Sequence, residues 1–207
     1  IPDSLIGLNV AFDDEQGERR LMQGKVNLEK AKKIAAAADV QLATISRVSN
    51  NVASGIVHTM KEYDVGEVVL GLHHKANIVD SFFGSIVENV LNGTHNEVMV
   101  VRCVMPPNTL CKVVVGVPPK AEYEIGFYKW LEHICRIVTQ LGCKIHFHAH
   151  TDTNKYIEGY VREKHASIRA EFSALDDWDD LLMLTSKVDY DHLFVVISAR
   201  SGYISYQ

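Results

Sequence analysis

The chain has 207 residues, of which 47% are hydrophobic and 23% are charged, and its formal net charge is −5. This composition is typical of a globular protein with a buried core, and the length allows one large domain or two small ones. The negative charge and the lack of a lysine- and arginine-rich stripe argue against a nucleic-acid partner. The longest apolar runs fall far short of the ~20 residues that a membrane-spanning helix requires.

The first half of the chain alternates between strand and helix patterns. Short apolar runs predict strands at Leu5–Phe12 and at residues 40–45, 68–70 and 97–102. Apolar residues at helical spacing predict helices over residues 19–39 and 52–63, and a shorter helix that begins near residue 85. Residues 105–110 contain two prolines and interrupt this alternation, so we interpret them as a linker.

The second half repeats the alternation. Strands are predicted at residues 111–117, 144–150 and 192–197, and helices at residues 122–141, 155–172 and 177–188. Strands that alternate with helices are typical of an α/β fold with a parallel sheet. We therefore expect two α/β units, residues 1–104 and 111–207, whose binding sites lie at the carboxyl ends of the strands.

An internal repeat supports the division into two units. Residues 64–74 align without gaps on residues 191–201, and Ser198 falls at the position of Gly71. The repeat predicts that each unit is incomplete as given. The opening strand of the first unit would precede Ile1, and the closing part of the second would follow Gln207. The first residues show neither the basic start nor the apolar core of a signal peptide.

The stretch from residue 67 to 92 carries the strongest candidate site. An apolar strand pattern stops at Gly71, a polar loop containing His74 follows, and Gly84 and Ser85 precede a helical pattern. Helix N-termini present unpaired N–H groups that bind anions, and glycine allows close approach of a ligand to the backbone. The alternative interpretation is structural, because Ser85 and Glu88 have the spacing of a capping box.

The spacing of Gly71, Gly84 and Ser85 resembles the nucleotide loop of the universal stress protein family, in which a second glycine stands at the position of His74. This resemblance implies Rossmann-like units of the adenine nucleotide alpha hydrolase kind, with ATP, ADP or AMP as the ligand. The implied contacts are Gly71, His74, Gly84 and Ser85 on the phosphates, with Asn9 and Val10 beside the base. The aspartate on the family's opening strand has no counterpart here, which favours binding in the first unit over the second.

Residues 69–76, 80–84 and 117–131 resemble the cytosolic C-terminal tail of bacterial cation:proton antiporters, which in some bacteria carries tandem stress-protein-like domains. This resemblance implies a non-catalytic regulatory region of a protein that exchanges sodium or another monovalent cation for protons. The implied partners are the membrane domain of the same chain and a second copy in a homodimer, on the cytoplasmic side of the inner membrane. The alternatives are a free-standing tandem universal stress protein that binds or slowly hydrolyses ATP, and a scaffold without ligand.

Three histidines, His146, His148 and His150, alternate along one predicted strand, so we expect their side chains to share a face. Neutral imidazoles at this spacing can bind zinc or nickel, which makes them weak metal candidates. A polar pocket or a subunit contact is the favoured interpretation, because no Cys, Asp or Glu stands in register with them.

The sequence contains no arrangement typical of a hydrolase. Ser85 lacks the Gly-x-Ser-x-Gly turn that exposes a nucleophilic serine, and the four cysteines show no Cys-x-x-Cys spacing. Buried reduced thiols are the default for such cysteines in a cytosolic protein. We therefore predict no catalytic residue and no enzymatic activity.

Overall fold

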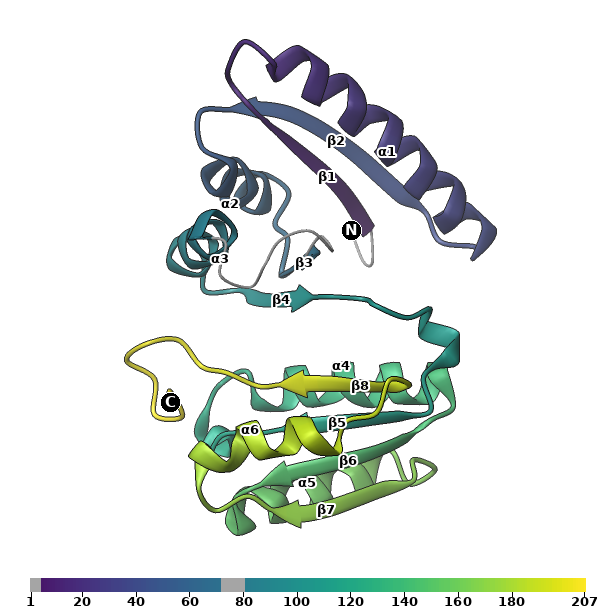
Figure 1. The fold of residues 1–207 in the computed structure, drawn as a ribbon, viewed down its shortest axis with the longest axis vertical. Helices are drawn as coiled ribbons and strands as arrows, with labels where there is room; N and C mark the ends of the chain where they lie inside the picture. Colours follow the sequence, from purple (N-terminus) through teal and green to yellow (C-terminus); the bar gives the residue numbers. More distant parts are fainter. Residues whose placement is uncertain (1–4, 72–80) are drawn as a thin grey trace. The chain divides into compact units, whose positions relative to one another are not determined.

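The computed structural model describes residues 5–71 and 81–207, apart from the side chains of residues 81–83. The chain divides into two compact units, Ile1–Arg102 and Cys103–Gln207. Both units alternate between strands and helices, and every strand pair is parallel (Figure 1). The predicted α/β class with parallel sheets is thus confirmed.

Unit 1 contains two separate pairs of strands. Its elements are β1 (Leu5–Phe12), α1 (Gly17–Ala37), β2 (Leu42–Ser49), α2 (Val52–Glu62), β3 (Glu67–Gly71), α3 (Ser81–Gly93) and β4 (Glu97–Val101). Strand β1 pairs with β2 along its whole length, and β3 pairs with β4. Among the described residues, no strand joins the two pairs into one sheet.

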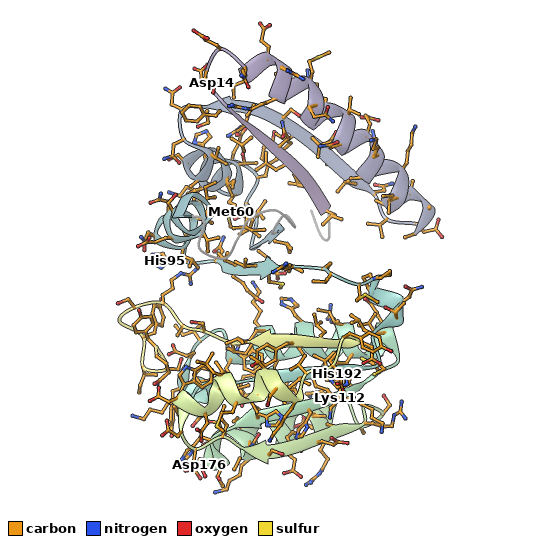
Figure 2. All side chains as sticks on the ribbon, in the orientation of Figure 1. Asp14, Met60, His95, Lys112, Asp176 and His192 are labelled. Atoms are coloured by element: carbon orange, nitrogen blue, oxygen red, sulfur yellow. The ribbon has the colours of Figure 1, made fainter. Side chains whose placement is uncertain are left out.

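Alternation along β1 sends successive side chains to opposite faces, and a helix covers each face. On one face, Leu28 of α1 packs against Gly7. On the other, Val10 packs against Gly55 of α2. The apolar centre of the unit lies on this second face and is formed by α2, α3 and the strands, with Met60 near its middle (Figure 2).

Unit 2 has a four-stranded parallel sheet in the order β7-β6-β5-β8. Its elements are β5 (Lys112–Gly116), α4 (Phe127–Leu141), β6 (Lys144–Ala149), α5 (Thr151–Lys164), β7 (Ala170–Ala174), α6 (Leu181–Leu184) and β8 (His192–Val196), with short 3-10 turns at Pro107–Thr109, Ala121–Tyr123, Trp178–Asp180 and Thr185–Lys187. Helices α4 and α5 cover one face of this sheet, and α6 lies over the other (Figure 1).

The two faces of this sheet differ in polarity. The face toward α4 and α5 is closely packed, because Val113 and Val115 of β5 and Ile145 and Phe147 of β6 are almost fully buried there. The opposite face carries His146 and His148 of β6, and the short helix α6 lies over it. The polar side chains that the sequence places in β6, His146 and His148, therefore lie on one face of the sheet only.

The strand order relates the two units. In unit 2 the first strand, β5, lies between β6 and β8 and pairs with both. If β1 is matched to β6 and β3 to β8, the described part of unit 1 has the same order without a strand in the position of β5. This arrangement explains why β1 and β3 each have one edge without a described partner strand.

Three predicted helices differ from the structure. The helix predicted over residues 155–172 is wrong in its second half, because α5 ends at Lys164 and β7 follows as an edge strand paired with β6. Gly126 separates a 3-10 turn from α4 within the helix predicted over residues 122–141. The helix predicted over residues 177–188 is a series of short turns around α6. No helix in the described ranges is long and apolar enough to cross a membrane.

Candidate functional site

The candidate phosphate loop joins β3 to α3 in unit 1. Gly71 is the last residue of β3, at the carboxyl end of the strand, and it is exposed. Among the described residues, a Cβ atom added at Gly71 or at Gly84 would meet no atom within 4 Å. His74 lies outside the described residues.

The predicted helix start at Ser85 is wrong. Helix α3 begins at Ser81, so Gly84 and Ser85 lie about one turn inside it and Ser85 does not cap its N-terminus. The unpaired N–H groups of a helix belong to its first turn. The helix continues through Gly84 because glycine inside a helix costs only about 0.5–1 kcal/mol relative to alanine. The N-terminus of this helix, where unpaired N–H groups could face an anion, is therefore at Ser81.

Asn9 and Val10 are consecutive residues of β1 and point to opposite faces of the strand. The Asn9 side chain is directed to α1, where it fills the space that a Cβ atom at Gly24 would need. The Asn9 Nδ2 atom is buried and has no hydrogen-bond partner among the described residues. Val10 packs on the other side against α2. Their contact with a nucleotide base stays a prediction.

Of the three predicted histidines, the structure brings two together. The His146 and His148 rings lie on the polar face of β6 with their centroids 4.0 Å apart. His146 Nε2 is 2.8 Å from the Ser173 hydroxyl oxygen, and its Nδ1 atom is 3.3 Å from the Lys112 ammonium nitrogen. His148 is only 6% exposed.

This environment keeps both imidazoles neutral. Burial lowers the pKa of His148 to about 4, with smaller contributions from His146 and from the Lys187 and Lys112 ammonium groups. Burial also lowers the pKa of His146, and Lys112 acts in the same direction while Glu171 opposes it. The pair therefore resists protonation at neutral pH.

The sequence predicted that His150 shares the face of His146 and His148. This prediction is wrong. Strand β6 ends at Ala149, and His150 forms the N-cap of α5, where its Nδ1 atom accepts a hydrogen bond from the Asp152 backbone N–H at 3.3 Å. The capping interaction turns the imidazole away from the strand. It places His150 at the carboxyl edge of the sheet.

A pocket of about 560 Å³ lies at this carboxyl edge. It is lined in part by Lys120, Tyr123, His150, Asp152, Lys155 and Tyr156. The pocket follows the ends of β5 and β6, the edge at which parallel α/β sheets bind ligands. Both tyrosine rings are largely exposed, and Lys155 is paired with Asp152 at 2.7 Å. The arrangement offers aromatic surface beside cationic groups.

This pocket was not predicted from the sequence. Its residues come from the turn after β5 and from the first turns of α5, which are separated by about thirty residues in the chain. The signal that was available is that Lys120 follows the strand predicted at residues 111–117 and that His150 ends the strand predicted at residues 144–150. Lys120 has a φ of 66°, a left-handed conformation that non-glycine residues seldom adopt.

A second polar cluster ties α4 to the end of α5. The Glu132 carboxylate accepts hydrogen bonds from the Tyr160 hydroxyl at 2.7 Å and the Arg136 guanidinium at 2.8 Å, and it lies 2.6 Å from His165 Nε2. The Tyr160 bond, then His165 and Arg136, lower the pKa of Glu132 to about 2. Because every member is held by another protein group, this cluster stabilises the fold.

Comparison with known proteins relates this geometry to a family. Residues 4–102 match the universal stress protein family. Unit 1 contains a universal stress protein domain. The match ends at the boundary between the units, and it covers the candidate loop after β3 together with both strand pairs.

The chain is also 19% identical over 164 residues to the Na(+)/H(+) antiporter NhaS5 of Synechocystis sp.. This similarity covers 79% of the chain but only 24% of the antiporter, so the chain spans about a quarter of that relative's length.

Two solved structures share the fold. One is a protein described as a universal stress protein from Pseudomonas aeruginosa UCBPP-PA14, with a TM-score of 0.56 and 14% identity. The other is a functionally unknown protein from P. aeruginosa PAO1, with a TM-score of 0.55 and 14% identity. Each comparison covers 98% of this chain and 84% of the other chain.

Proposed function

We propose that this chain is a regulatory region of a cation:proton antiporter, whose membrane domain would carry out the exchange of sodium or another monovalent cation for protons. The observation that carries the proposal is the similarity to an antiporter over most of this chain. A universal stress protein domain in unit 1 agrees with it, because such a domain supplies a binding fold without a path for an ion. In this role the chain would lie on the cytoplasmic side of the membrane.

The second part of the proposal is that unit 2 is a diverged copy of unit 1. The aligned segments 64–74 and 191–201 both contain a strand, β3 in one and β8 in the other. In the matched strand order, β3 follows β2 along the chain just as β8 follows β7, and in each case the chain passes from the first strand pair to the opposite side of the β5 position. The chain would then be a tandem of two stress-protein-like units that associates as a homodimer.

The third part is that unit 1 senses an adenine nucleotide, ATP, ADP or AMP, at the carboxyl end of β3. Gly71 ends that strand and α3 begins at Ser81 after the candidate loop, so a strand end and a helix N-terminus would both supply backbone N–H groups to one phosphate group. The open space beside Gly71 and Gly84 supports close approach of a ligand. The role is non-catalytic, so the nucleotide would leave unchanged.

Calorimetric titration of ATP, ADP and AMP into the chain tests the ligand. We expect binding in the high micromolar to millimolar range for the wild-type chain, and none for Gly84→Val. The valine should fit the fold, because a Cβ atom at Gly84 meets no described atom within 4 Å. Its side chain should therefore obstruct the bound nucleotide without disturbing the packing of the unit. Gly159→Val is the matched control, since Gly159 of α5 also borders open space in unit 2.

Unchanged binding in Gly84→Val would move the site away from this loop. Failure of all three nucleotides to bind would favour a scaffold without ligand. Hydrolysis of ATP during the titration would contradict the non-catalytic role.

The competing function is a free-standing tandem universal stress protein. It is favoured by the solved structure described as a universal stress protein, which is covered to 84% by this chain. The complete coding region distinguishes the two functions. About ten to twelve apolar segments of ~20 residues each, encoded upstream, would support the antiporter, and a start codon shortly before Ile1 would support the free-standing protein.

A further inference from the structure

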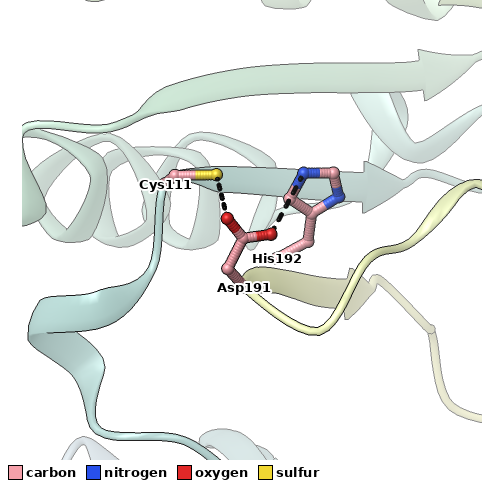
Figure 3. Close-up of side chains that lie close together, drawn as sticks. All are labelled: Cys111, Asp191 and His192. Atoms are coloured by element: carbon pink, nitrogen blue, oxygen red, sulfur yellow. Dashed lines mark hydrogen bonds and ion pairs between the residues drawn. The ribbon is translucent and has the colours of Figure 1, made fainter.

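Three side chains with metal-binding atoms meet at the amino-terminal edge of the unit 2 sheet, opposite the edge where ligands usually bind. Cys111 directly precedes β5, and Asp191 and His192 stand at the start of β8 (Figure 3). The two strands are neighbours with Lys112 opposite His192, and the Cys111 N–H donates to the Asp191 carbonyl at 2.9 Å. The sheet register therefore fixes the three residues beside one another, although 80 residues of chain separate Cys111 from Asp191.

Their ligand atoms are close together. The Cys111 thiol donates to Asp191 Oδ2 at 3.0 Å, and His192 Nε2 is 3.9 Å from Asp191 Oδ1. One ligand atom from each residue lies within 4.8 Å of the others. A second carboxylate, that of Asp189, has its Oδ2 atom 3.9 Å from the same His192 nitrogen.

We propose that Cys111, Asp191 and His192 form a binding site for a divalent cation of the zinc class, with Asp189 or a water molecule as the fourth ligand. Sulfur, imidazole nitrogen and carboxylate oxygen together are the donor set that zinc takes in proteins. The harder cations magnesium and calcium prefer oxygen ligands alone, and a thiolate therefore selects against them.

The spacing fits a tetrahedral ion after small side-chain rotations. Zinc–sulfur bonds of about 2.3 Å and zinc–nitrogen or zinc–oxygen bonds of about 2.0 Å place tetrahedral ligand atoms roughly 3.3–3.7 Å apart. The contacts of 3.0 Å and 3.9 Å lie on either side of this range. His192 is mostly buried and lies at the start of β8, so the sheet orients its ring (Figure 2).

Binding of the ion has a defined proton balance. The Cys111 thiol releases its proton to solvent as the metal–sulfur bond forms. The Asp191 carboxylate then loses the hydrogen bond from this thiol and binds the metal in its place. In the structure the Asp189 backbone N–H donates to His192 Nδ1 at 3.1 Å, which leaves the proton of the neutral ring on Nε2. Coordination through Nε2 moves that proton to Nδ1 and breaks the Asp189 hydrogen bond. The amide resonance of Asp189 should therefore shift on binding.

The charge around the site suits a metal held by several anionic ligands. Cys111 and His192 also line a cavity of about 520 Å³, whose other charged residues are Lys112, Lys144, Arg169 and Glu171. The three cationic groups outnumber the one carboxylate and would repel a bare cation. A thiolate and the carboxylates of Asp189 and Asp191 carry three negative charges, so one divalent cation leaves the cluster with a net charge of −1. The lysines and the arginine then offset this residual charge.

Titration with cobalt(II), a spectroscopic substitute for zinc, tests the site in the full chain. We expect one equivalent of Co²⁺ to produce a thiolate-to-cobalt charge-transfer band in the near ultraviolet, and one equivalent of Zn²⁺ to abolish it. Cys111→Ser should remove the band and weaken Zn²⁺ binding at least tenfold in calorimetry, and His192→Gln should weaken it similarly. Cys103→Ser is the matched control, because Cys103 is also an exposed free thiol but lies outside the cluster.

A second measurement needs no substitution. Alkylation of Cys111 and Cys103 by iodoacetamide, followed by mass spectrometry, should slow at least tenfold at Cys111 when Zn²⁺ is saturating and remain unchanged at Cys103. Equal alkylation of Cys111 with and without Zn²⁺ would overturn the proposal, as would a cobalt–thiolate band that survives in Cys111→Ser. A shift of the Asp189 amide by Zn²⁺ in the wild-type chain alone would support it.

Discussion

At the residue scale, the contact between Asn9 and Gly24 shows how a single glycine positions a helix on a sheet. A Cβ atom added at Gly24 would overlap the Asn9 amide group, because it would lie 2.1 Å from the Asn9 Cγ atom and 2.1 Å from the Asn9 Nδ2 atom. Gly24 is one of the two buried residues of α1, so the helix lies close to β1 there. An ordinary interior residue would require α1 or the asparagine to move.

We predict that Gly24→Ala destabilises the chain by about 1–2 kcal/mol. Overpacking of this kind costs about 1–3 kcal/mol, and the better helix propensity of alanine returns up to ~1 kcal/mol. Gly159→Ala is the matched control, because Gly159 lies inside α5 beside open space, and we expect it to stabilise by about 0.5–1 kcal/mol. Urea denaturation measures both changes, and equal stabilisation by the two alanines would refute the packing argument.

The buried histidine pair predicts a loss of stability in acid. The pKa of His148 is about 4 in the folded chain, below the ordinary value near 6.5, so the unfolded chain binds the proton first. The free energy of unfolding should therefore fall as the pH drops from about 6.5 through 4, by at most about 3 kcal/mol for this residue.

Melting temperatures from pH 7.5 to 4 measure this effect. The charged groups that face the pair are Lys112, Lys187 and Glu171. Lys112 lowers the pKa of the Glu171 carboxyl, so this carboxylate stays ionised over most of the range and the histidines should dominate the local change. His148→Gln should reduce the slope between pH 6.5 and 4. His58→Gln should leave it unchanged, because His58 is 74% exposed. The same slope in all three proteins would remove His148 as the cause.

Some single residues of the candidate sites could be predicted from the sequence and others could not. The glycine that ends β3 could be found because a strand pattern leads directly into it. Cys111 and the Asp191–His192 pair could not be connected, because only the register of β5 against β8 makes them neighbours. The position of Ser85 inside α3 was missed because a capping-box spacing also occurs in helix interiors.

At the element scale, continuous apolar runs were predicted better than a short strand of mixed polarity. Leu5–Phe12 has the predicted bounds because it is a continuous apolar run between polar turns. Strand β7 was taken for helix because its five residues include Glu171 and Ser173, which face the polar side of the sheet. Its alternation with Ala170 and Phe172 was too short to outweigh the helical pattern before it.

The strand order predicts different hydrogen-exchange protection for β5 and β1. β5 is paired on both edges and its residues Val113–Gly116 are buried, whereas β1 is paired only with β2 among the described strands. We expect the β5 amides to exchange slowest, and alternate amides of β1, whose N–H groups face away from β2, to exchange at least tenfold faster. Exchange monitored by NMR measures this difference. Equal protection along β1 and β5 would show that another segment pairs with β1.

At the scale of the whole molecule, the two compact units and the antiporter similarity lead to one account. The sequence predicted a linker at residues 105–110, and the units divide between Arg102 and Cys103. The similarity to an antiporter continues across this boundary, since it covers 164 residues of the chain. Both units would therefore belong to one regulatory region. The candidate contacts Gly71, Gly84, Asn9 and Val10 belong to three separate elements of unit 1, so the sequence alone could not show which of them share a site.

Ion transport by the complete product of the gene tests this account most directly. Sodium-driven proton movement would be measured in everted membrane vesicles that contain either the full-length protein or a version lacking residues 5–207, each with and without millimolar ATP. We predict that both versions transport, and that the half-saturating sodium concentration or the rate changes with ATP only when residues 5–207 are present. Identical transport by the two versions under all conditions would contradict a regulatory role for this chain.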